Sequence, residues 1–452
     1  MPAPPNPSSG EGSTSDRLSG RVFRGSFVST FADSAPSVNG TASDRNRRAA
    51  LTLLSAAAVR ERAGEVLAAG LDGRLDHFTV HADWLAAAAV IVADVVRTNY
   101  PTLAVPFHAR WRHFLVAGRD LWRERVAAIR WPDAAARARA AIDLAMVSVL
   151  LDAGAGGAWR YRDQATGVEL GRSEGLALAS LRMFEAGVFS ADPADPLRAD
   201  AARLAAIAAD DLAAGFQAGD ANPLPGLDGR AALLARLGRA VAGNPGVFAR
   251  RGAARPGGLF DFLVAAWGER LPAPRLLEAL LVHLAEIWPG RLTLGGVGLG
   301  DTWRHPAVKR ADASDGLIPF HKLSQWLAYS LIEPLQDAGI DVTDIDGLTG
   351  LAEYRNGGLF VDAGVIALRD PAAAQRPNPV EGPLVVEWRA LTIALLDRIA
   401  PLVRERLGVS EPAFPLARVL EGGTWAAGRR LARERRPDGG PPIRVASDGT
   451  VF

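Results

Sequence analysis

The sequence predicts an all-α protein, mainly helical with one or two small β-hairpins. Three observations lead to this prediction. Apolar residues recur at helical spacing through most of residues 45–410. Strand-like alternation is sparse, and no long linker or 30–50-residue repeat divides that region. Although 452 residues could supply two or three domains, we therefore expect one helical body.

The first predicted helix covers residues 45–68, and Gly70 supplies its C-terminal stop. The second, 81–99, is a buried helix that Tyr100-Pro101 closes. The same spacing predicts further helices, in chain order, at 121–129, 134–151, 176–185, 201–217, 230–242, 259–267, 275–287, 319–336, 345–355 and 385–406. Residues 159–162 and 168–171 flank a turn and predict a hairpin, and 443–452 suggest a second.

The composition indicates where the helical domain begins and ends, and it excludes several functional classes. Residues 1–44 are rich in Pro, Ser and Gly and predict a disordered extension, so the helical catalytic domain is 45–410 with 411–452 as a tail packed on it. A net charge of +1 gives no electrostatic reason to expect nucleic acid or membrane as a partner. Without cysteine there is no disulfide, thiolate nucleophile or Cys-based metal site.

The chain also gives no sign of a membrane span or secretory signal. Its longest apolar run, residues 84–93, is half of the roughly 20 residues that a transmembrane helix needs. The N-terminus has no cationic segment followed by an apolar run. We expect a cytoplasmic protein that acts on a small molecule and needs neither a cofactor nor a metal.

Lysine is almost absent from this chain. Only Lys309 and Lys322 occur among 51 cationic residues, and all the others are arginines. An amine can change its protonation state where a guanidinium cannot, so a lysine that persists here can be needed as lysine. Chance survival is the other interpretation.

Two polar clusters precede Lys322. In 106–114, two arginines and two histidines lie among aromatic residues, and in a helix His108 and Arg112 would share a face suited to phosphate, carboxylate or a planar heterocycle. Asp301, Trp303 and His305 follow a glycine-rich loop, where binding groups often lie. Solvated cations around packed aromatics, and a turn-capping Asp beside a packed Trp, are the structural alternatives.

Two later segments present further polar faces. In the predicted helix 319–336, Lys322, Gln325 and Tyr329 line up at i, i+3 and i+7. From the predicted helix 345–355 onward, Asp346, Thr349, Glu353 and Asn356 form one polar face at i, i+3, i+7 and i+10. The Glu353 carboxylate there could stabilise a cation or activate water. The polar face from Asp346 onward is explained equally well by acids that stabilise the N-terminal end of the helix dipole together with a Glu–Arg pair on the surface.

The loop 341–350, acidic and ending in Thr-Gly, has the look of a phosphoribosyltransferase loop. That motif needs a buried apolar strand ahead of it, whereas residues 337–340 look like a helix end. No G-x-S-x-G elbow or H-E-x-x-H metal spacing occurs.

Over 45–410 and the terminal Ser-Asp-Gly-Thr-Val-Phe, the chain resembles a uracil-catabolism family, formerly domain of unknown function 1688, which includes the fourth fungal uracil-catabolism protein. The resemblance is carried by 106–114, 299–305, 318–329 and 351–364. It implies a pathway in which uracil becomes a nucleotide, its ring is opened, and a ribosylurea-type intermediate releases urea.

A more distant resemblance covers 317–369. Phe-His-Lys-Leu-Ser-Gln at 320–325 and Leu-Ala-Glu-Tyr-Arg at 351–355 are similar to segments of queuosine-salvage nucleotide N-glycosidases. That likeness implies a DNA-glycosylase-like helical body and an acid that assists glycosidic cleavage. Glu353 stands where those enzymes have Asp, and Asn356-Gly357-Gly358 replaces their Val-Pro-Gln.

Together the resemblances imply an N-glycosyl hydrolase acting on a ring-opened uracil nucleotide. Glu353 would stabilise the cation at C1′ and position water, and His321 or His305 would protonate the leaving group. The expected substrate-binding residues are Lys322, Gln325, Tyr354, Arg355, His108, Arg112, Asp301, Trp303 and His305. A uracil phosphoribosyltransferase-type enzyme and a non-catalytic binding protein of the same pathway are the alternatives.

Overall fold

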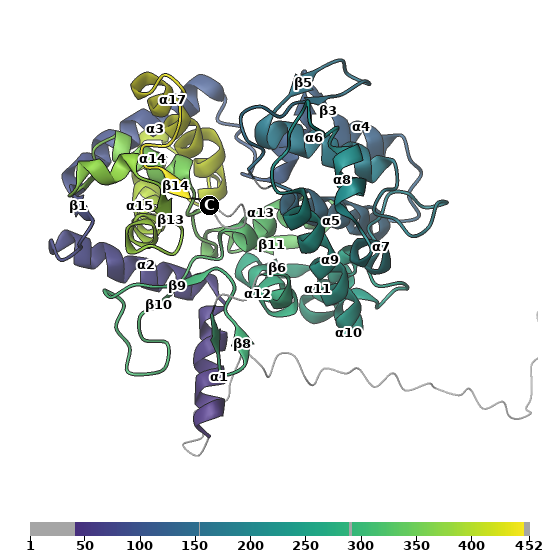
Figure 1. Ribbon diagram of the computed structural model, residues 1–452, viewed down its shortest axis with the longest axis horizontal. Coiled ribbons are helices and arrows are strands. Elements are labelled where there is room, and N and C mark those ends of the chain that lie inside the picture. Colours follow the sequence, from purple (N-terminus) through teal and green to yellow (C-terminus); the bar gives the residue numbers. More distant parts are fainter. Residues whose placement is uncertain (1–40, 153, 289–291, 447–452) are drawn as a thin grey trace, which may run out of the picture. The chain divides into compact units, whose positions relative to one another are not determined.

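A computed structural model describes residues 41–152, 154–288 and 292–446, all within one compact unit. The fold is mainly helical, as the sequence predicts (Figure 1). The α-helices are α1 (Ala42–Leu53), α2 (Ala56–Leu71), α3 (Leu85–Asn99), α4 (Leu121–Ala127), α5 (Ala134–Leu150), α6 (Arg172–Glu185), α7 (Ala201–Ala205), α8 (Ala209–Gly215), α9 (Leu227–Gly243), α10 (Pro245–Phe248), α11 (Leu259–Trp267), α12 (Ala273–His283), α13 (Lys322–Gln336), α14 (Tyr354–Asp362), α15 (Pro383–Leu407), α16 (Leu416–Val419) and α17 (Trp425–Arg435).

Shorter elements connect these helices. The turns that matter for the site are the 3₁₀ helices η3 (Arg110–Phe114) and η6 (Ile345–Gly347) and the π-helical turn η8 (Leu420–Thr424). Strands occur only in pairs within the described ranges. The antiparallel pairs are β1 (Phe78–Val80) with β12 (Ile366–Leu368), β2 (Leu115–Val116) with β3 (Arg119–Asp120), β4 (Tyr161–Arg162) with β5 (Glu169–Leu170), β7 (Thr293–Leu294) with β8 (Val297–Gly298), and β9 (Thr302–Arg304) with β10 (Leu317–Pro319); β6 (Arg270–Pro272) pairs parallel with β11 (Asp341–Thr343), and β13 (Asn378–Pro379) with β14 (Val445–Ala446).

Helix α15 organises the part of the fold that holds the candidate site. It has 25 residues, is buried on nearly all sides over its first half, and packs against α2, α3 and α14. A helix that is apolar all round lies in the core of a large protein. Arg389 and Thr392 are fully buried polar residues on it, and α17 packs on α14 from the C-terminal segment.

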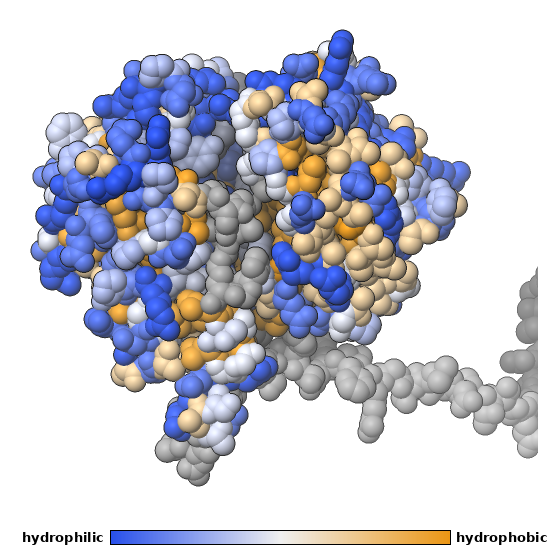
Figure 2. Space-filling view, viewed as in Figure 1, coloured by the Kyte–Doolittle hydropathy of each residue, from blue (hydrophilic) through white to orange (hydrophobic). Residues whose placement is uncertain are grey.

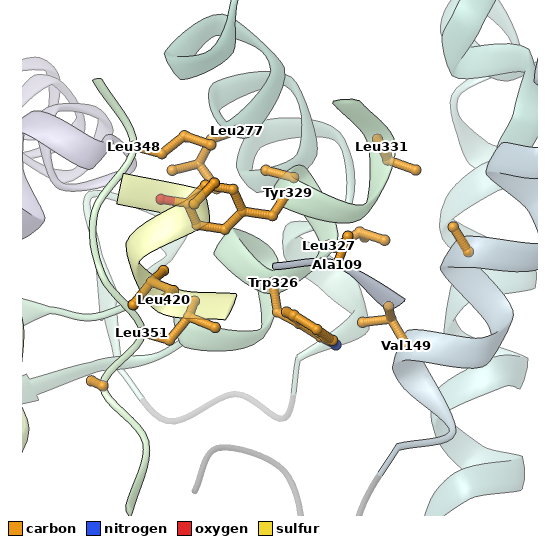
Figure 3. Packing of buried hydrophobic residues seen from close by; sticks show 14 of the residues in the cluster. Ala109, Val149, Leu277, Trp326, Leu327, Tyr329, Leu331, Leu348, Leu351 and Leu420 are labelled. Atoms are coloured by element: carbon orange, nitrogen blue, oxygen red, sulfur yellow. The ribbon is translucent and has the colours of Figure 1, made fainter. Parts of the chain in front are cut away.

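Helix α13 links this region to α5 and α12. Figure 3 shows Tyr329 of α13 beside Leu277 and Leu348, while Trp326 lies toward Ala109 and Val149. The middle of α13 therefore packs against apolar residues on two sides. Figure 2 shows hydrophilic side chains over much of the visible face, with more hydrophobic ones over α9–α11 than over α2.

The predicted helix 345–355 is wrong. Residues 345–347 form η6, 348–353 are not helical, and α14 begins at Tyr354. Arg60 explains the difference, because its guanidinium donates to the carbonyls of Asp346 (2.9 Å) and Leu348 (2.7 Å), and the Tyr329 hydroxyl donates to the carbonyl of Thr349 (3.0 Å). Tertiary donors thus occupy carbonyls that a helix would use for its own bonds.

Two further helix predictions and one conditional alignment need correction. The helix predicted over 45–68 is two helices, because Ser55 caps α2 by accepting from the Ala58 amide (3.2 Å). The one predicted over 201–217 is split into α7 and α8. In 106–114 only η3 is helical, so His108 and Arg112 do not share a helical face.

The hairpin predicted at 159–162 and 168–171 is confirmed as β4 and β5. Of the hairpin predicted over 443–452, the structure describes only the start, where β14 pairs parallel with β13; residues 447–452 lie outside the described part. The predicted disordered extension also lies outside it, except that α1 begins at Ala42 with Thr41 as its cap.

Candidate functional site

Three residues expected in the site lie on separate elements, far apart in the chain, and are linked by their electrostatic effects on one another. Lys322 is the first residue of α13, Glu353 is the N-cap of α14, and His108 lies in the extended segment before η3. Their charges act on one another: positive charge on Lys322 and on His108 favours the ionised Glu353, and the Glu353 carboxylate favours the charged Lys322. We call Lys322, Glu353 and His108 the central cluster.

The Glu353 carboxylate caps α14. Its Oε2 accepts from the amide of Arg355 (2.7 Å) and its Oε1 from the amide of Asn356 (2.5 Å). Burial raises the pKa of Glu353, and these two hydrogen bonds and the charge on Lys322 offset only part of that effect. Each carboxylate oxygen keeps a second lone pair, so a capping role leaves Glu353 able to accept a proton or face a cation.

The Lys322 amine has no carboxylate at ion-pair distance among the described residues. The side chain is only partly exposed, and loss of water around it lowers the pKa of the amine, while the charge on Glu353 works in the opposite direction. An unpaired, partly desolvated cation is costly unless something binds it. Phosphate or another anion would supply the missing partner.

A buried ion pair holds the backbone of Lys322 in place. Asp301 accepts two parallel hydrogen bonds from Arg389 of α15 (2.8 and 2.7 Å), one from the Trp303 indole (2.6 Å) and one from the Lys322 amide (3.0 Å). Burial opposes the charge on Asp301, but the Arg389 guanidinium and these bonds outweigh it and lower the pKa of Asp301. Asp301 and Trp303 therefore support the start of α13.

His321, the expected proton donor, occupies a left-handed backbone conformation with φ 48°. Its Nε2 lies 2.9 Å from the carbonyl of Leu53, so this nitrogen carries the proton that the carbonyl accepts. Burial lowers the pKa of His321 despite that hydrogen bond. A buried neutral imidazole bonded to backbone is poorly suited to supply a proton to a leaving group.

His108 has the opposite character. Its Nδ1 lies 2.6 Å from a carboxylate oxygen of Glu421 on η8, and its ring packs on Trp326 with centroids 4.6 Å apart. In the part of the chain that the structure describes, Nε2 has no hydrogen-bond partner. The ring is thus fixed at one nitrogen and available at the other.

Other expected site residues are bonded elsewhere. Gln325 exchanges two hydrogen bonds with Thr349. His305 accepts from the Ala307 amide at Nδ1 (3.2 Å) and faces Glu387 at Nε2 (3.4 Å). Both are buried, and both have their polar atoms committed within the fold.

Arg112 and Arg355 also have internal partners. Arg112 binds Glu333 (2.7 Å) and lines a separate cavity of about 290 Å³ that the central cluster does not line. Arg355 donates to the carbonyl of Gly439 (2.8 Å), and its guanidinium lies 4.8 Å from the ring centre of Tyr354. Both guanidinium groups are thus anchored within the fold, although the Nε of Arg112 is buried without a hydrogen-bond partner among the described residues.

The acid of the phosphoribosyltransferase-like loop is committed as well. Asp346 pairs with Arg404 and accepts from the Leu416 amide (2.5 Å). The short strand β11 forms the first three residues of this loop, and among the described residues it pairs only with β6. The two bonds of Asp346 tie the loop to α15 and α16.

Two groups that act on the central cluster were not expected from the sequence. Glu421 is flanked only by Leu420 and Gly422-Gly423, so no polar pattern marks it. The charge on Asp152 also favours charged Lys322, although Asp152 itself pairs with Arg110 (2.7 Å). Asn356 was visible in the sequence as part of a polar face; both of its amide atoms are buried without a partner.

The central cluster offers a carboxylate, an imidazole with one nitrogen unbonded among the described residues, and an amine that has no ion-pair partner there. These are the groups for acid–base work on an anionic substrate. Within the described residues, no three histidine, aspartate or glutamate side chains are grouped so that they could share a metal ion. No helix there is long and apolar enough to cross a bilayer.

Comparisons with known proteins agree on one family. The family model described as "Protein of unknown function (DUF1688)" matches residues 52–452. The chain is 39% identical over 412 residues to "Protein urg3" of Schizosaccharomyces pombe, covering 88% of this chain and 98% of that protein. It is 38% identical over 417 residues to "Uracil catabolism protein 4" of Lachancea kluyveri, covering 84% and 93%.

Proposed function

This chain belongs to the DUF1688 family, and from that membership and the central cluster we propose that it is an enzyme of uracil catabolism that hydrolyses the N-glycosidic bond of a ribosylurea phosphate. A similar protein bears the name uracil catabolism protein, which supports the pathway. The reaction class rests on the structure of the site. Its main support is Lys322, whose amine has no ion-pair partner among the described residues and whose charged form the Glu353 carboxylate favours.

The reaction is a displacement by water. The C1′–N bond breaks and its electron pair stays on the ureido nitrogen, which takes a proton from His108 Nε2. Water forms the new bond to C1′ and gives its proton to Glu353. The products are ribose 5-phosphate and urea, and the proton on Glu353 returns to His108 through solvent.

Each residue of the central cluster has one task. The negative Glu353 carboxylate stabilises the positive charge that develops at C1′, and this stabilisation acts only in the transition state. His108 protonates a poor leaving group, which is worth about 10²–10⁴ in rate. Lys322 holds the phosphate. This assignment gives His108 the role that the sequence analysis gave to His321 or His305, because those two imidazoles are bonded within the fold.

The decisive experiment incubates the purified protein with ribosylurea 5-phosphate and measures free urea. In H₂¹⁸O the label should appear at C1 of ribose 5-phosphate, because water attacks that carbon. The Glu353→Gln protein, purified in parallel, is the control for contaminating activity. Ribosylurea without phosphate should react poorly, since it offers Lys322 no anion.

Two other results would replace the proposal. Formation of uridine monophosphate from uracil and phosphoribosyl pyrophosphate would make the protein a transferase. Tight binding of ribosylurea phosphate without release of urea would make it a binding protein of the same pathway.

A further inference from the structure

We propose that Glu421 is a positioning residue that fixes the tautomer and orientation of His108, so that Nε2 is the nitrogen presented to the reacting bond. This inference deepens the proposed function and rests on it for its kinetic test alone. Its structural test, described below, needs no substrate. In the proposed reaction Glu421 contacts neither the reacting atoms nor Glu353, and it acts only through His108.

His108 is held at three points by two segments that lie far away in the sequence. Its backbone amide donates to the carbonyl of Ala417 (2.9 Å), and its Nδ1 contacts Glu421 at 2.6 Å. The Trp326 ring of α13 covers one face of the imidazole. With the ring fixed by these contacts, the direction of Nε2 is fixed as well.

The π-helical turn η8 explains how Glu421 reaches His108. Residues 416–435 run from α16 through η8 into α17, and π-turns inside helices often mark functional positions. Gly423 lets the turn press against α3: a Cβ there would come within 2.6 Å of a methyl of Val92 and 3.1 Å of one of Val96. Any side chain at 423 would push the turn outward and draw Glu421 away from His108.

A carboxylate at Nδ1 decides which imidazole nitrogen handles the proton. An ionised carboxylate only accepts hydrogen bonds, so Nδ1 must carry a hydrogen in either protonation state. The neutral ring then has its lone pair on Nε2, and the protonated ring has its transferable hydrogen there. In general, a carboxylate bound to one ring nitrogen of a catalytic histidine leaves the other nitrogen to give or accept the proton.

The structural test is nuclear magnetic resonance of the free protein with ¹⁵N-labelled histidine. Long-range ¹H–¹⁵N correlations distinguish a ring protonated at Nδ1 from one protonated at Nε2, and the His108→Asn spectrum assigns the signal among the seven histidines of the chain. The wild type should keep Nδ1 protonated at every pH. In Glu421→Gln, whose amide can donate as well as accept, neutral His108 should show both tautomers. An unchanged spectrum would overturn the proposal.

The kinetic test is a double-mutant cycle. Glu421→Gln should lower kcat for ribosylurea phosphate by about 10²-fold, the lower end of what an acid–base group contributes, while KM changes little. His108→Asn should lose at least as much. Because the two residues act as a unit, the double variant should be no slower than His108→Asn alone. Losses that multiply would show that Glu421 acts independently of His108.

Glu387→Gln is the matched control, since Glu387 also faces a histidine, at 3.4 Å from His305. It should cost stability, because Glu387 also accepts from the Phe78 amide (2.8 Å), and should leave kcat unchanged. If the wild type releases no urea, the proposed reaction fails, but the tautomer result still decides the role of Glu421.

Discussion

The two lysines of this chain show how differently one residue type can be used. Lys309 is exposed, whereas Lys322 is partly enclosed, with its pKa lowered by burial and with the carboxylates of Glu353 and Asp152 acting on it. The scarcity of lysine in the sequence singles out both lysines, and we propose Lys322, through its electrostatic interaction with Glu353, as the functional one. No sequence pattern could show that His305 and Gln325 have their polar atoms committed internally, because their partners lie at 387 and 349.

Glu353→Gln should lower kcat by about 10²–10⁴-fold while KM changes little. Two unit charges 4 Å apart at an effective dielectric near 20 interact by about 4 kcal/mol, and half of that is about 30-fold in rate. Loss of water activation supplies the rest. The substrate carries no positive charge in its ground state, so binding should be preserved. Steady-state kinetics on ribosylurea phosphate give both constants.

Asp133→Asn makes the same chemical change at the cap of α5, where Asp133 accepts from the Ala136 amide (2.6 Å). It should leave turnover unchanged and so separates capping from catalysis. Near-normal turnover in Glu353→Gln would mean that the Glu353 carboxylate serves only as a helix cap.

His113 should make the fold sensitive to acid. Burial, followed by the charge on Arg110, lowers the pKa of His113 to about 3, and the unfolded chain has the ordinary value of 6.5. Between these values the unfolded state binds a proton that the folded state does not, so the free energy of unfolding falls as pH drops below 6.5. From pH 7 to pH 5 the loss from this residue is at most about 2 kcal/mol.

His113→Gln removes this titration. Urea unfolding at pH 7 and pH 5 should show that the variant loses less stability than the wild type over that interval, whatever its stability at pH 7. Parallel losses in the two proteins would place the acid sensitivity in other groups.

At the level of elements, helices with a strong apolar period were predicted well. The range 259–267 is α11, and 134–151 and 385–406 differ from α5 and α15 by at most two residues at either end. The range 345–355 failed although its polar residues have helical spacing. Its backbone is bound instead by side chains from other helices: Arg60 binds the carbonyl of Leu348, and Tyr329 and Gln325 bind the backbone of Thr349. Contacts between residues so far apart in the chain cannot be recognised from the spacing of neighbouring residues.

Gly357→Ala tests how closely α14 must approach α15. A Cβ at 357 would lie 2.8 Å from the Trp388 ring and from Thr392 Oγ1, and the Trp388 indole donates to the Gly357 carbonyl (3.1 Å). Overpacking of this kind should cost about 1–3 kcal/mol, seen as a lower denaturation midpoint at unchanged slope.

Gly229→Ala in α9 is the matched variant, because nothing lies within 4 Å of its added Cβ. It should stabilise the protein by roughly 0.5–1 kcal/mol through helix propensity. If both substitutions had the same sign, close packing at Gly357 would not be the cause.

At the level of the whole molecule, the candidate site draws on residues 108, 322, 353 and 421, so it exists only when distant helices are assembled. The sequence could nominate members of this set by residue type and by family resemblance. It could not pair His108 with Glu421, because 313 positions separate them and Glu421 lies on a π-turn that no periodicity predicts.

A ligand that bridges these segments should therefore stabilise the whole fold. Ribose 5-phosphate, the proposed product, at 100 times its Kd should add about 2.7 kcal/mol to the free energy of unfolding. For a body of about 400 residues, with an unfolding entropy near 2.1 cal/mol/K per residue, that is a rise in Tm of about 3 °C. Lys322→Met should abolish the rise because it removes the amine that binds phosphate, and Lys309→Met, at an exposed position, should keep it. Differential scanning calorimetry of the three proteins with and without ribose 5-phosphate measures the effect. An equal rise in wild type and Lys322→Met would mean that phosphate binds away from the central cluster, and Lys322 would then need another partner to explain its unpaired amine.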